Sequence, residues 1–186
     1  DYFKHDNYYS IQGDISNAED MKKAFVEIKN KFGTVHILLN NAGISHSSQA
    51  LFLTVEKASE MININFLGAF IVSKEAAKLM MKSKFGRIVN IGSICSTVEP
   101  IGASIYSATK AALHSLSNSL AKEFSTFNIT SNTIALSPFP TDMLNTISQK
   151  DIDWYLNEQK IKRLATIDDI TNVVEFFSSE KSAFIT

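Results

Sequence analysis

Short apolar runs rich in β-branched residues alternate along the chain with longer stretches in which apolar residues recur at helical spacing. The short runs predict strands at residues 8–12, 35–39, 87–91 and 129–135. The longer stretches predict helices at residues 17–31, 55–83, 104–124, 147–160 and 167–177. Because this alternation is typical of βα units, we expect a parallel sheet with helices packed against it.

Residues at the ends of these segments support the predicted boundaries. Asn17 can cap the first helix through its side-chain oxygen, and Gly33 is suited to end that helix. The run at 35–39 is too short for a helix and suits a strand covered on both faces. Pro138 and Pro140 open an irregular segment after the last strand, at the sheet edge where α/β proteins bind ligands. We therefore expect this segment to form a lid.

The composition narrows the class of protein. The chain has 186 residues, 45% hydrophobic and 20% charged, with 18 basic and 19 acidic residues. These values fit one globular domain and exclude disordered and disulfide-framework proteins. A net charge of −1 gives no positive field to attract nucleic acid. No run approaches the ~20 apolar residues of a membrane-spanning helix. With a single cysteine, Cys95, we expect a cytoplasmic enzyme or binding protein that has no nucleic-acid or membrane partner.

Four polar residues from separate segments could form one reactive site. Tyr106 and Lys110 are four residues apart on a predicted helix, which places a phenol and an ammonium on one face. Ser93 follows the third predicted strand. Asn65 lies within the second predicted helix, where a polar side chain on a largely apolar face needs a reason. Each residue alone has an ordinary structural explanation, whereas all four in this order point to chemistry.

A known family shares the order and spacing of Asn65, Ser93, Tyr106 and Lys110. With the Asn-Asn-Ala-Gly loop at 40–43 and the Asn-Phe-Leu-Gly segment at 65–68, the chain resembles the classical short-chain dehydrogenases/reductases. The resemblance covers nearly the whole chain and is nearest to the β-ketoacyl-carrier-protein reductases. It implies a Rossmann-like α/β fold, with a doubly wound parallel sheet in a three-layer α/β/α arrangement.

The resemblance also implies a catalytic mechanism. The protein would be an NAD(P)-dependent oxidoreductase that transfers a hydride between a nicotinamide and a carbonyl or secondary alcohol, such as a 3-oxoacyl thioester, a sugar or a small alcohol. Tyr106 would be the acid/base, Ser93 would orient the substrate oxygen, and Asn65 would hold a proton-relay water. Lys110 would bind the nicotinamide ribose and favour the phenolate of Tyr106. Lowering a tyrosine pKa from about 10 to about 7 requires roughly 4 kcal/mol.

The cofactor-binding residues follow from the same resemblance. Asp14-Ile15 resembles the acidic turn with which the family contacts the adenine ring. Thr141 resembles the threonine that meets the amide group of the nicotinamide. The full set implied for the cofactor is Asp14, Ile15, Asn41, Ala42, Gly43, Tyr106, Lys110, Phe139 and Thr141. Roles as a turn residue for Asp14 and as a helix cap for Thr141 stay open. No cluster of residues has metal-binding spacing, and the choice between NAD and NADP stays open.

The sequence departs from the family in two places. Leu136-Ser137 stands where the family has Pro-Gly, which changes the turn that carries Phe139. The chain also has no glycine-rich turn between a first strand and a first helix, which in such folds binds the pyrophosphate. The first two strands and the last strand of the family's sheet are not found. We therefore expect residues 1–186 to be a single partial domain of a longer protein.

The sequence is also compatible with two other functions, and it predicts an oligomer. The chain could be a non-catalytic binding or scaffold protein that has lost its dinucleotide site, or a sugar-nucleotide epimerase or dehydratase, which shares Tyr-x-x-x-Lys. By family analogy we expect a homo-oligomer, dimer or tetramer, built through the helices at 55–83 and 104–124. The remaining expected partner is a small carbonyl or alcohol substrate.

Overall fold

A parallel sheet forms the middle of the molecule. The computed structural model describes residues 7–186, which form the strands β1 (Ile37–Asn40), β2 (Gly86–Ser93) and β3 (Ile129–Leu136), in the order β1-β2-β3. Both pairings are parallel, and Ile88 of β2 lies in register with Leu38 on one side and Ser131 on the other. β2 is the central strand and is buried along nearly all of its length. The predicted parallel sheet is confirmed.

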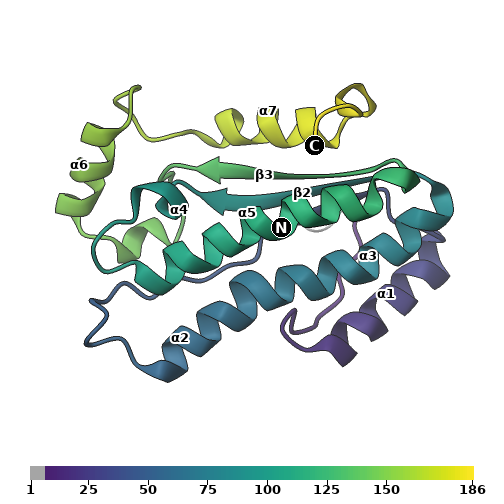
Figure 1. Cartoon of the computed structure of the whole chain (residues 1–186), viewed down its shortest axis with the longest axis horizontal. Coiled ribbons are helices and arrows are strands. Elements are labelled where there is room, and N and C mark those ends of the chain that lie inside the picture. The colour runs from purple at the N-terminus through teal and green to yellow at the C-terminus, as the bar shows by residue number, and fades with distance from the viewer. Residues whose placement is uncertain (1–6) are drawn as a thin grey trace.

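Helices cover both faces of this sheet (Figure 1). One face packs against α1 (Ala18–Phe32), α3 (Ala69–Ser83) and α5 (Ser104–Phe124). α2 (Val55–Ile62) leads into α3 through a π-helical turn (Asn63–Gly68). The opposite face carries α7 (Ile167–Ser178). Short 3-10 turns occur at Ser125–Phe127, Leu144–Thr146 and Glu180–Ser182. The three-layer, Rossmann-like arrangement expected from the sequence is therefore confirmed.

Two further helices lie near the carboxyl ends of the strands. α4 (Cys95–Val98) follows β2 directly, and α6 (Gln149–Glu158) belongs to the segment between β3 and α7. Figure 1 shows both at the end of the sheet to which the strand arrows point. Because ligands of open α/β sheets bind at this end, the two helices border the candidate site.

The predicted ends of α1 are explained by its caps. The side-chain oxygen of Asn17 accepts hydrogen bonds from the backbone N–H groups of Glu19, at 3.0 Å, and Asp20, at 3.3 Å. At the other end Gly33 adopts φ 79°, a left-handed conformation that glycine takes without a steric penalty. The start and end of this helix are therefore determined by the residues next to them in the sequence.

The main core lies between the sheet and the layer formed by α1 and α3. Met80 and Ile88 are fully buried there. Burying side chains of this size stabilises the fold by about 1.5–3 kcal/mol each, which is the main force that holds the helices to the sheet. The buried cluster consists of Phe25, Ala76, Leu79, Met80, Ile88 and Ile129.

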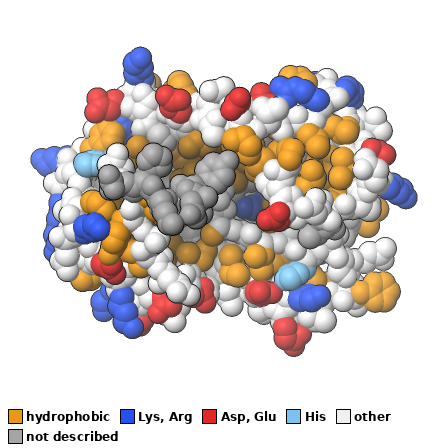
Figure 2. All heavy atoms as spheres, turned by 180° about the vertical axis from the view of Figure 1, so that it is seen from behind, with side chains coloured by type: hydrophobic (Ala, Val, Ile, Leu, Met, Phe, Trp, Pro, Cys, Tyr) orange, Lys and Arg blue, Asp and Glu red, His pale blue; other side chains and the backbone are white. Residues whose placement is uncertain are grey.

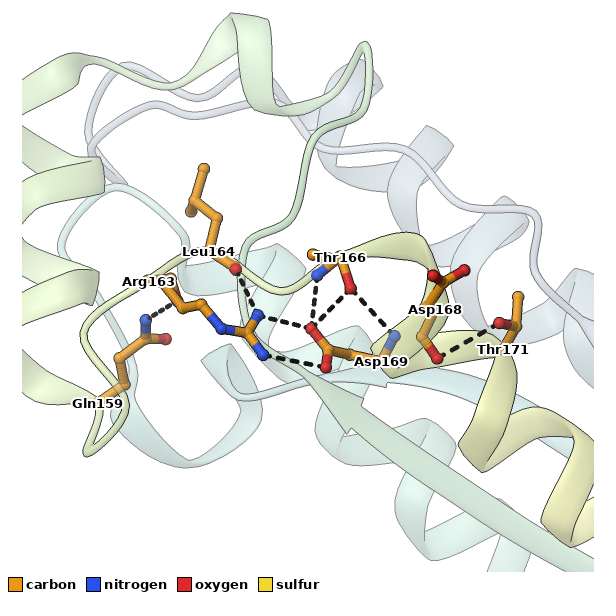
Figure 3. A network of polar contacts seen from close by, with 7 residues as sticks. All are labelled: Gln159, Arg163, Leu164, Thr166, Asp168, Asp169 and Thr171. Carbon is orange, nitrogen blue, oxygen red and sulfur yellow. Dashed lines mark hydrogen bonds and ion pairs between the residues drawn. The ribbon is translucent and has the colours of Figure 1, made fainter.

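α7 begins at a dense polar network. The hydroxyl of Thr166 accepts a hydrogen bond from the backbone N–H of Asp169, whose carboxylate in turn accepts one from the backbone N–H of Thr166. Arg163 binds the same carboxylate through both guanidinium nitrogens, at 2.6 and 3.1 Å (Figure 3). Gln159, directly after α6, donates to the backbone oxygen of Arg163 at 2.5 Å. The end of α6 is thus joined to the start of α7.

The strand predicted at residues 8–12 is wrong. These residues have no regular secondary structure, and Tyr8 and Tyr9 are exposed. An extended segment becomes a strand only when another strand pairs with its backbone, and the described residues supply none beside it. The segment instead contacts α1, where the Tyr9 hydroxyl donates to Glu27 and the Tyr9 ring packs edge-on against Phe32.

The long helix predicted at 55–83 is confirmed with one difference. Its backbone continues from α2 to α3, but the π-helical turn interrupts the α-helical geometry in the middle. Such turns occur frequently at functional sites, and this one contains Asn65.

The buried amide of Asn90 connects the three strands of the described sheet. Asn90 of β2 accepts a hydrogen bond from Asn40 of β1 at 2.8 Å and donates to the backbone oxygen of Asn132 in β3 at 3.2 Å. It also donates to the Ser117 hydroxyl of α5 at 3.2 Å. A buried amide is tolerated here because its donors and acceptor are all paired.

We predict that Asn90→Leu lowers the free energy of unfolding by roughly 2–4 kcal/mol, since it leaves polar groups of the buried network without partners. Urea denaturation measures this change. Asn30→Leu, on the exposed side of α1, is the matched control and is expected to stay within about 0.5 kcal/mol of the wild type. Equal stability of Asn90→Leu and the wild type would contradict the structural role of the amide network.

Candidate active site

The four residues singled out by the sequence converge at the carboxyl end of β2. Ser93 is the last residue of β2, Tyr106 and Lys110 lie in the first two turns of α5, and Asn65 lies in the π-helical turn. Asn65, Ser93 and Lys110 are buried, with exposed fractions of 1%, 7% and 4%, and Tyr106 is half-buried. The structure therefore brings together groups from three separate segments.

The ammonium of Lys110 is held between the sheet and α5. Its Nζ donates a hydrogen bond to the backbone oxygen of Ile91 at 2.7 Å and lies 5.7 Å from the centre of the Tyr106 ring. Burial lowers the pKa of Lys110 to about 8, and the nearby Cys95 opposes this shift. An ammonium has three N–H donors, so Lys110 can bind further acceptors in addition to Ile91.

The phenol of Tyr106 is protonated at neutral pH. Burial raises the pKa of Tyr106, Cys95 raises it further, and a hydrogen bond with Ser93 acts in the opposite direction. This direction is opposite to the one expected from Lys110, because desolvation of the buried ring disfavours the charged phenolate. A neutral phenol is a proton donor, which is the form that protonates a carbonyl oxygen during its reduction.

The side chain of Asn65 has a structural use. Its Oδ1 accepts a hydrogen bond from the backbone N–H of Ile44 at 2.8 Å, and its Nδ2 donates to the backbone oxygen of Ile44 at 2.9 Å. The same Nδ2 donates to the Thr109 hydroxyl at 3.2 Å. Asn65 thus fixes the loop after β1 to α5, which gives a reason for a polar residue on this helix.

The Asn-Ala-Gly loop extends the site toward β1. Gly43 lies so close to two of the candidate site residues that a methyl group added to it would be 3.4 Å from Oδ1 of Asn65 and 3.5 Å from Nζ of Lys110. Asn41 and Ala42 border a small cavity of about 80 Å³, which Ile15 also lines. The implied cofactor residues of this loop are therefore continuous with Lys110.

Asp14 and Ile15 reach this loop from the beginning of the chain. Ile15 packs against Gly68 of the π-helical turn, where an added methyl group would lie 2.9 Å from Cδ1 of Ile15. Only glycine leaves room for this contact. Asp14 is exposed and accepts two hydrogen bonds from Ser16, at 2.8 and 2.7 Å, which lower its pKa. The turn-residue role of Asp14 is thus present in the structure, beside the proposed adenine contact.

Phe139 and Thr141 follow β3 at the same end of the sheet, but their contacts in the structure are local. The hydroxyl of Thr141 donates weakly to the backbone oxygen of Phe139 at 3.4 Å and accepts from the backbone N–H of Leu144 at 3.3 Å. The hydroxyl of Thr141 thus bonds only within its own turn, and the N-cap of the following 3-10 turn is Met143. The cofactor roles of Phe139 and Thr141 stay predictions.

Sequence reasoning missed one residue that borders this site. Tyr155 of α6 is buried, and its hydroxyl lies 3.2 Å from Sγ of Cys95, two residues after Ser93. No motif marks Tyr155, because the contact joins segments 60 residues apart. Cys95 is itself buried and makes this hydrogen bond.

Two negative findings apply to the described part of the chain. Within residues 7–186, no group of three or more His, Cys, Asp or Glu is arranged to hold a metal ion. Over the same range, none of the helices combines the length and the apolar character needed to cross a bilayer.

Comparisons with known proteins agree with this geometry. A family model described as short chain dehydrogenase matches residues 3–152. The 3-oxoacyl-(acyl-carrier-protein) reductase FabG of Buchnera aphidicola subsp. Baizongia pistaciae is 35% identical over 180 residues, which span 97% of this chain and 74% of that protein. The corresponding reductase MabA of Mycobacterium tuberculosis H37Rv is 30% identical over 177 residues, 95% of this chain and 72% of MabA.

A solved structure shares the fold. It is the crystal structure of a dehydrogenase from Agrobacterium tumefaciens provisionally assigned to gluconate, with a TM-score of 0.92 and 26% identity. The match covers 97% of this chain and 72% of that one.

We predict that burial of Lys110 makes stability rise with pH in the alkaline range. Its folded pKa of about 8 lies below the usual 10.5, so the unfolded chain binds this proton more tightly between these two values. The unfolding free energy of the wild type, minus that of Lys110→Met, should therefore increase by about 3 kcal/mol at most as pH rises from 8 toward 10.5. Urea denaturation of both proteins at several pH values measures it, and a constant difference would contradict the burial effect.

Proposed function

The chain belongs to the short-chain dehydrogenase family and is an oxidoreductase acting on CH–OH groups, and from this premise we propose that it reduces 3-oxoacyl thioesters with a nicotinamide cofactor. The names of the FabG and MabA relatives support this substrate class. The observation that carries the proposal is the convergence of Ser93, Tyr106 and the buried Lys110 at the carboxyl end of β2.

The residues present fit the nicotinamide half of such a cofactor. The buried ammonium of Lys110 has one backbone acceptor, Ile91, and keeps donors for the hydroxyl groups of a ribose. Gly43 has no side chain, so the space between its Cα and this ammonium is free. A methyl group added to Gly43 would reach 3.5 Å from Nζ, which is ordinary contact distance. Asp14 and Ile15 would contact the adenine, and Asn41 and Ala42 would lie beside the cofactor. Thr141 would meet the nicotinamide amide, next to backbone contacts from Phe139. When bound, the nicotinamide supplies the hydride, and NADH and NADPH are both compatible with these residues.

In the proposed mechanism, the protein controls a proton and the position of a carbonyl oxygen. Ser93 orients the substrate oxygen through its hydroxyl. Tyr106 donates its phenolic proton to that oxygen as the carbonyl carbon is reduced, and its raised pKa keeps the proton in place until then. Lys110 stabilises the phenolate that forms. Asn65 positions Ile44 and the loop beside Lys110 through its paired amide.

We further propose that β1 pairs with another strand on its outer edge, as expected for a partial domain. Ile37 and Leu39 of β1 are exposed by 49% and 43%, although a strand inside a parallel sheet normally has both faces covered. Hydrophobic side chains also gather across the middle of the face opposite to the view of Figure 1 (Figure 2). A glycine-rich strand–helix unit at this edge would complete the pyrophosphate site.

We also propose a homo-oligomer formed through the long helix and α5. The long helix exposes Ile62, Leu67 and Phe70, and monomers seldom expose extended apolar surface. Nearby, Leu51 and Ile101 are more than nine-tenths exposed and line a cavity of about 570 Å³ against α5. A second copy of the chain would cover these side chains.

We predict that Tyr106→Phe lowers turnover of a 3-oxoacyl thioester by at least about 10³-fold, because it removes the acid that protonates the carbonyl. Both NADH and NADPH are tested in a steady-state assay that follows nicotinamide absorbance. Cofactor binding should survive, so the cofactor that the wild type uses should still raise the melting temperature of the variant.

Tyr9→Phe, which loses a hydroxyl on the surface of α1, is the control and should keep wild-type turnover. Wild-type turnover in Tyr106→Phe would remove this residue from the mechanism. A wild-type protein that neither turns over nor gains thermal stability with either cofactor would favour the non-catalytic scaffold.

We predict a dimer or tetramer of the 20.6 kDa chain at micromolar concentration, as measured by light scattering. Phe70→Glu should shift the mass toward the monomer, because it places a charge in the proposed interface. Val26→Glu introduces the same charge on the exposed side of α1 and should leave the mass unchanged. A monomeric wild type would contradict the proposed assembly.

A further inference from the structure

α6 is attached to the catalytic region by a single buried side chain. The helix lies at the carboxyl ends of β2 and β3, next to α4 (Figure 1). Within α6, all of whose backbone the structure describes, only Tyr155 is buried, with 6% of its surface exposed. The rest of the helix faces solvent or is half-buried. Tyr155 is therefore the most deeply buried contact between this helix and the site.

The hydroxyl of Tyr155 is linked to the catalytic serine through Cys95. It lies 3.2 Å from Sγ of Cys95, and the backbone N–H of Cys95 donates to Oγ of Ser93 at 3.1 Å. Cys95 itself is 7% exposed. A phenol from α6 thus reaches the same turn that positions Ser93.

The phenols of Tyr155 and Tyr106 are near neighbours with different environments. Burial raises the pKa of Tyr155, the hydrogen bond with Cys95 raises it further, and the charges of Cys95, Tyr106 and Asp151 add smaller effects in the same direction. Only Tyr106 has the hydrogen bond with Ser93 that favours its ionised form. Tyr155 stays neutral and is suited to fill space and donate a hydrogen bond.

The far end of α6 is also fixed. Gln159 donates to the backbone oxygen of Arg163, and Arg163 binds Asp169 at the start of α7 (Figure 3). Because the C-terminal end of α6 is fixed in this way, the single contact between Tyr155 and Cys95 is enough to hold the helix over the site.

We propose that Tyr155 is a specificity-determining and positioning residue, whose contact with Cys95 holds α6 over the catalytic site and limits the width of the substrate beside its carbonyl group. This inference rests on the proposed function for its substrate. The ring of Tyr155 is buried against Cys95, two residues after Ser93, so in this proposal a branch on the carbon adjacent to the carbonyl would collide with it. Loss of the ring opens this space, whereas loss of the hydroxyl alone loosens the helix.

The first experiment compares two thioester substrates, the 3-oxobutanoyl and 2-methyl-3-oxobutanoyl esters of N-acetylcysteamine. In Tyr155→Ala the ratio of kcat/KM for the branched over the unbranched ester should rise about 10-fold or more, as expected for one methyl group in a pocket. Tyr155→Phe keeps the ring, so it should raise KM for both esters about 3-fold or more with kcat within about 2-fold. A ratio measured on one sample does not depend on the folded fraction, so a purely structural role would leave it unchanged.

The second experiment needs no turnover. Cys95 is the only cysteine of the chain, so its alkylation by iodoacetamide reports access beneath α6. Alkylation should be about 10-fold faster in Tyr155→Ala than in the wild type, and about 2-fold faster in the milder Tyr155→Phe. Tyr9→Phe loses an equivalent hydroxyl on the surface of α1 and should match the wild type in both experiments.

An unchanged substrate ratio in Tyr155→Ala would overturn the specificity role, and an unchanged alkylation rate would overturn the closure of α6 by Tyr155. If the wild type reduces neither ester, the proposed function fails. In that case faster alkylation of Tyr155→Ala still supports closure by this residue, and an unchanged rate overturns it.

Discussion

The side chain of Asn65 makes with Ile44 the two hydrogen bonds that a neighbouring strand would make, one to the backbone N–H and one to the backbone oxygen. A third bond, to Thr109, extends this connection to α5. Three elements are thereby fixed to one another: the loop after β1, the π-helical turn and the helix that carries Tyr106 and Lys110. The position of the loop beside the Lys110 ammonium depends on this amide, because without it the backbone of Ile44 would lose its partners.

Burial at this junction also sets the acid–base properties of the site. Desolvation favours the neutral forms of both titratable catalytic groups, lowering the pKa of Lys110 to about 8 and raising that of Tyr106. Ser93 opposes the shift only at Tyr106, which distinguishes this phenol from that of Tyr155. The result is a neutral phenol held beside a cation with unused donors, which is the combination that the proposed reduction of a carbonyl group uses. The same low-dielectric surroundings strengthen any charge interaction that develops when a substrate reacts.

Local patterns predicted most of the architecture. Helical periodicity and caps such as Asn17 and Gly33 depend on neighbouring residues, and the prediction of α5 at 104–124 agrees with the structure at both ends. Strand formation depends on distant partners. The run at 8–12 has the composition of a strand, but it lacks regular structure because the described residues offer no strand for its backbone to pair with. The π-helical turn was likewise hidden, since no local propensity marks it.

The sequence by itself determined the family, the order of the βα units, and the residue types at the candidate active site, because motif spacing and amphipathic periodicity are properties of the chain alone. Only the tertiary structure decided how those residues act. The pKa of Tyr106 is raised because burial is a property of packing, and Gly68 is needed because Ile15 packs against it from a distant segment. The contact between Cys95 and Tyr155 has no signal in the sequence, because it exists only where the folded chain brings α6 to the end of β2.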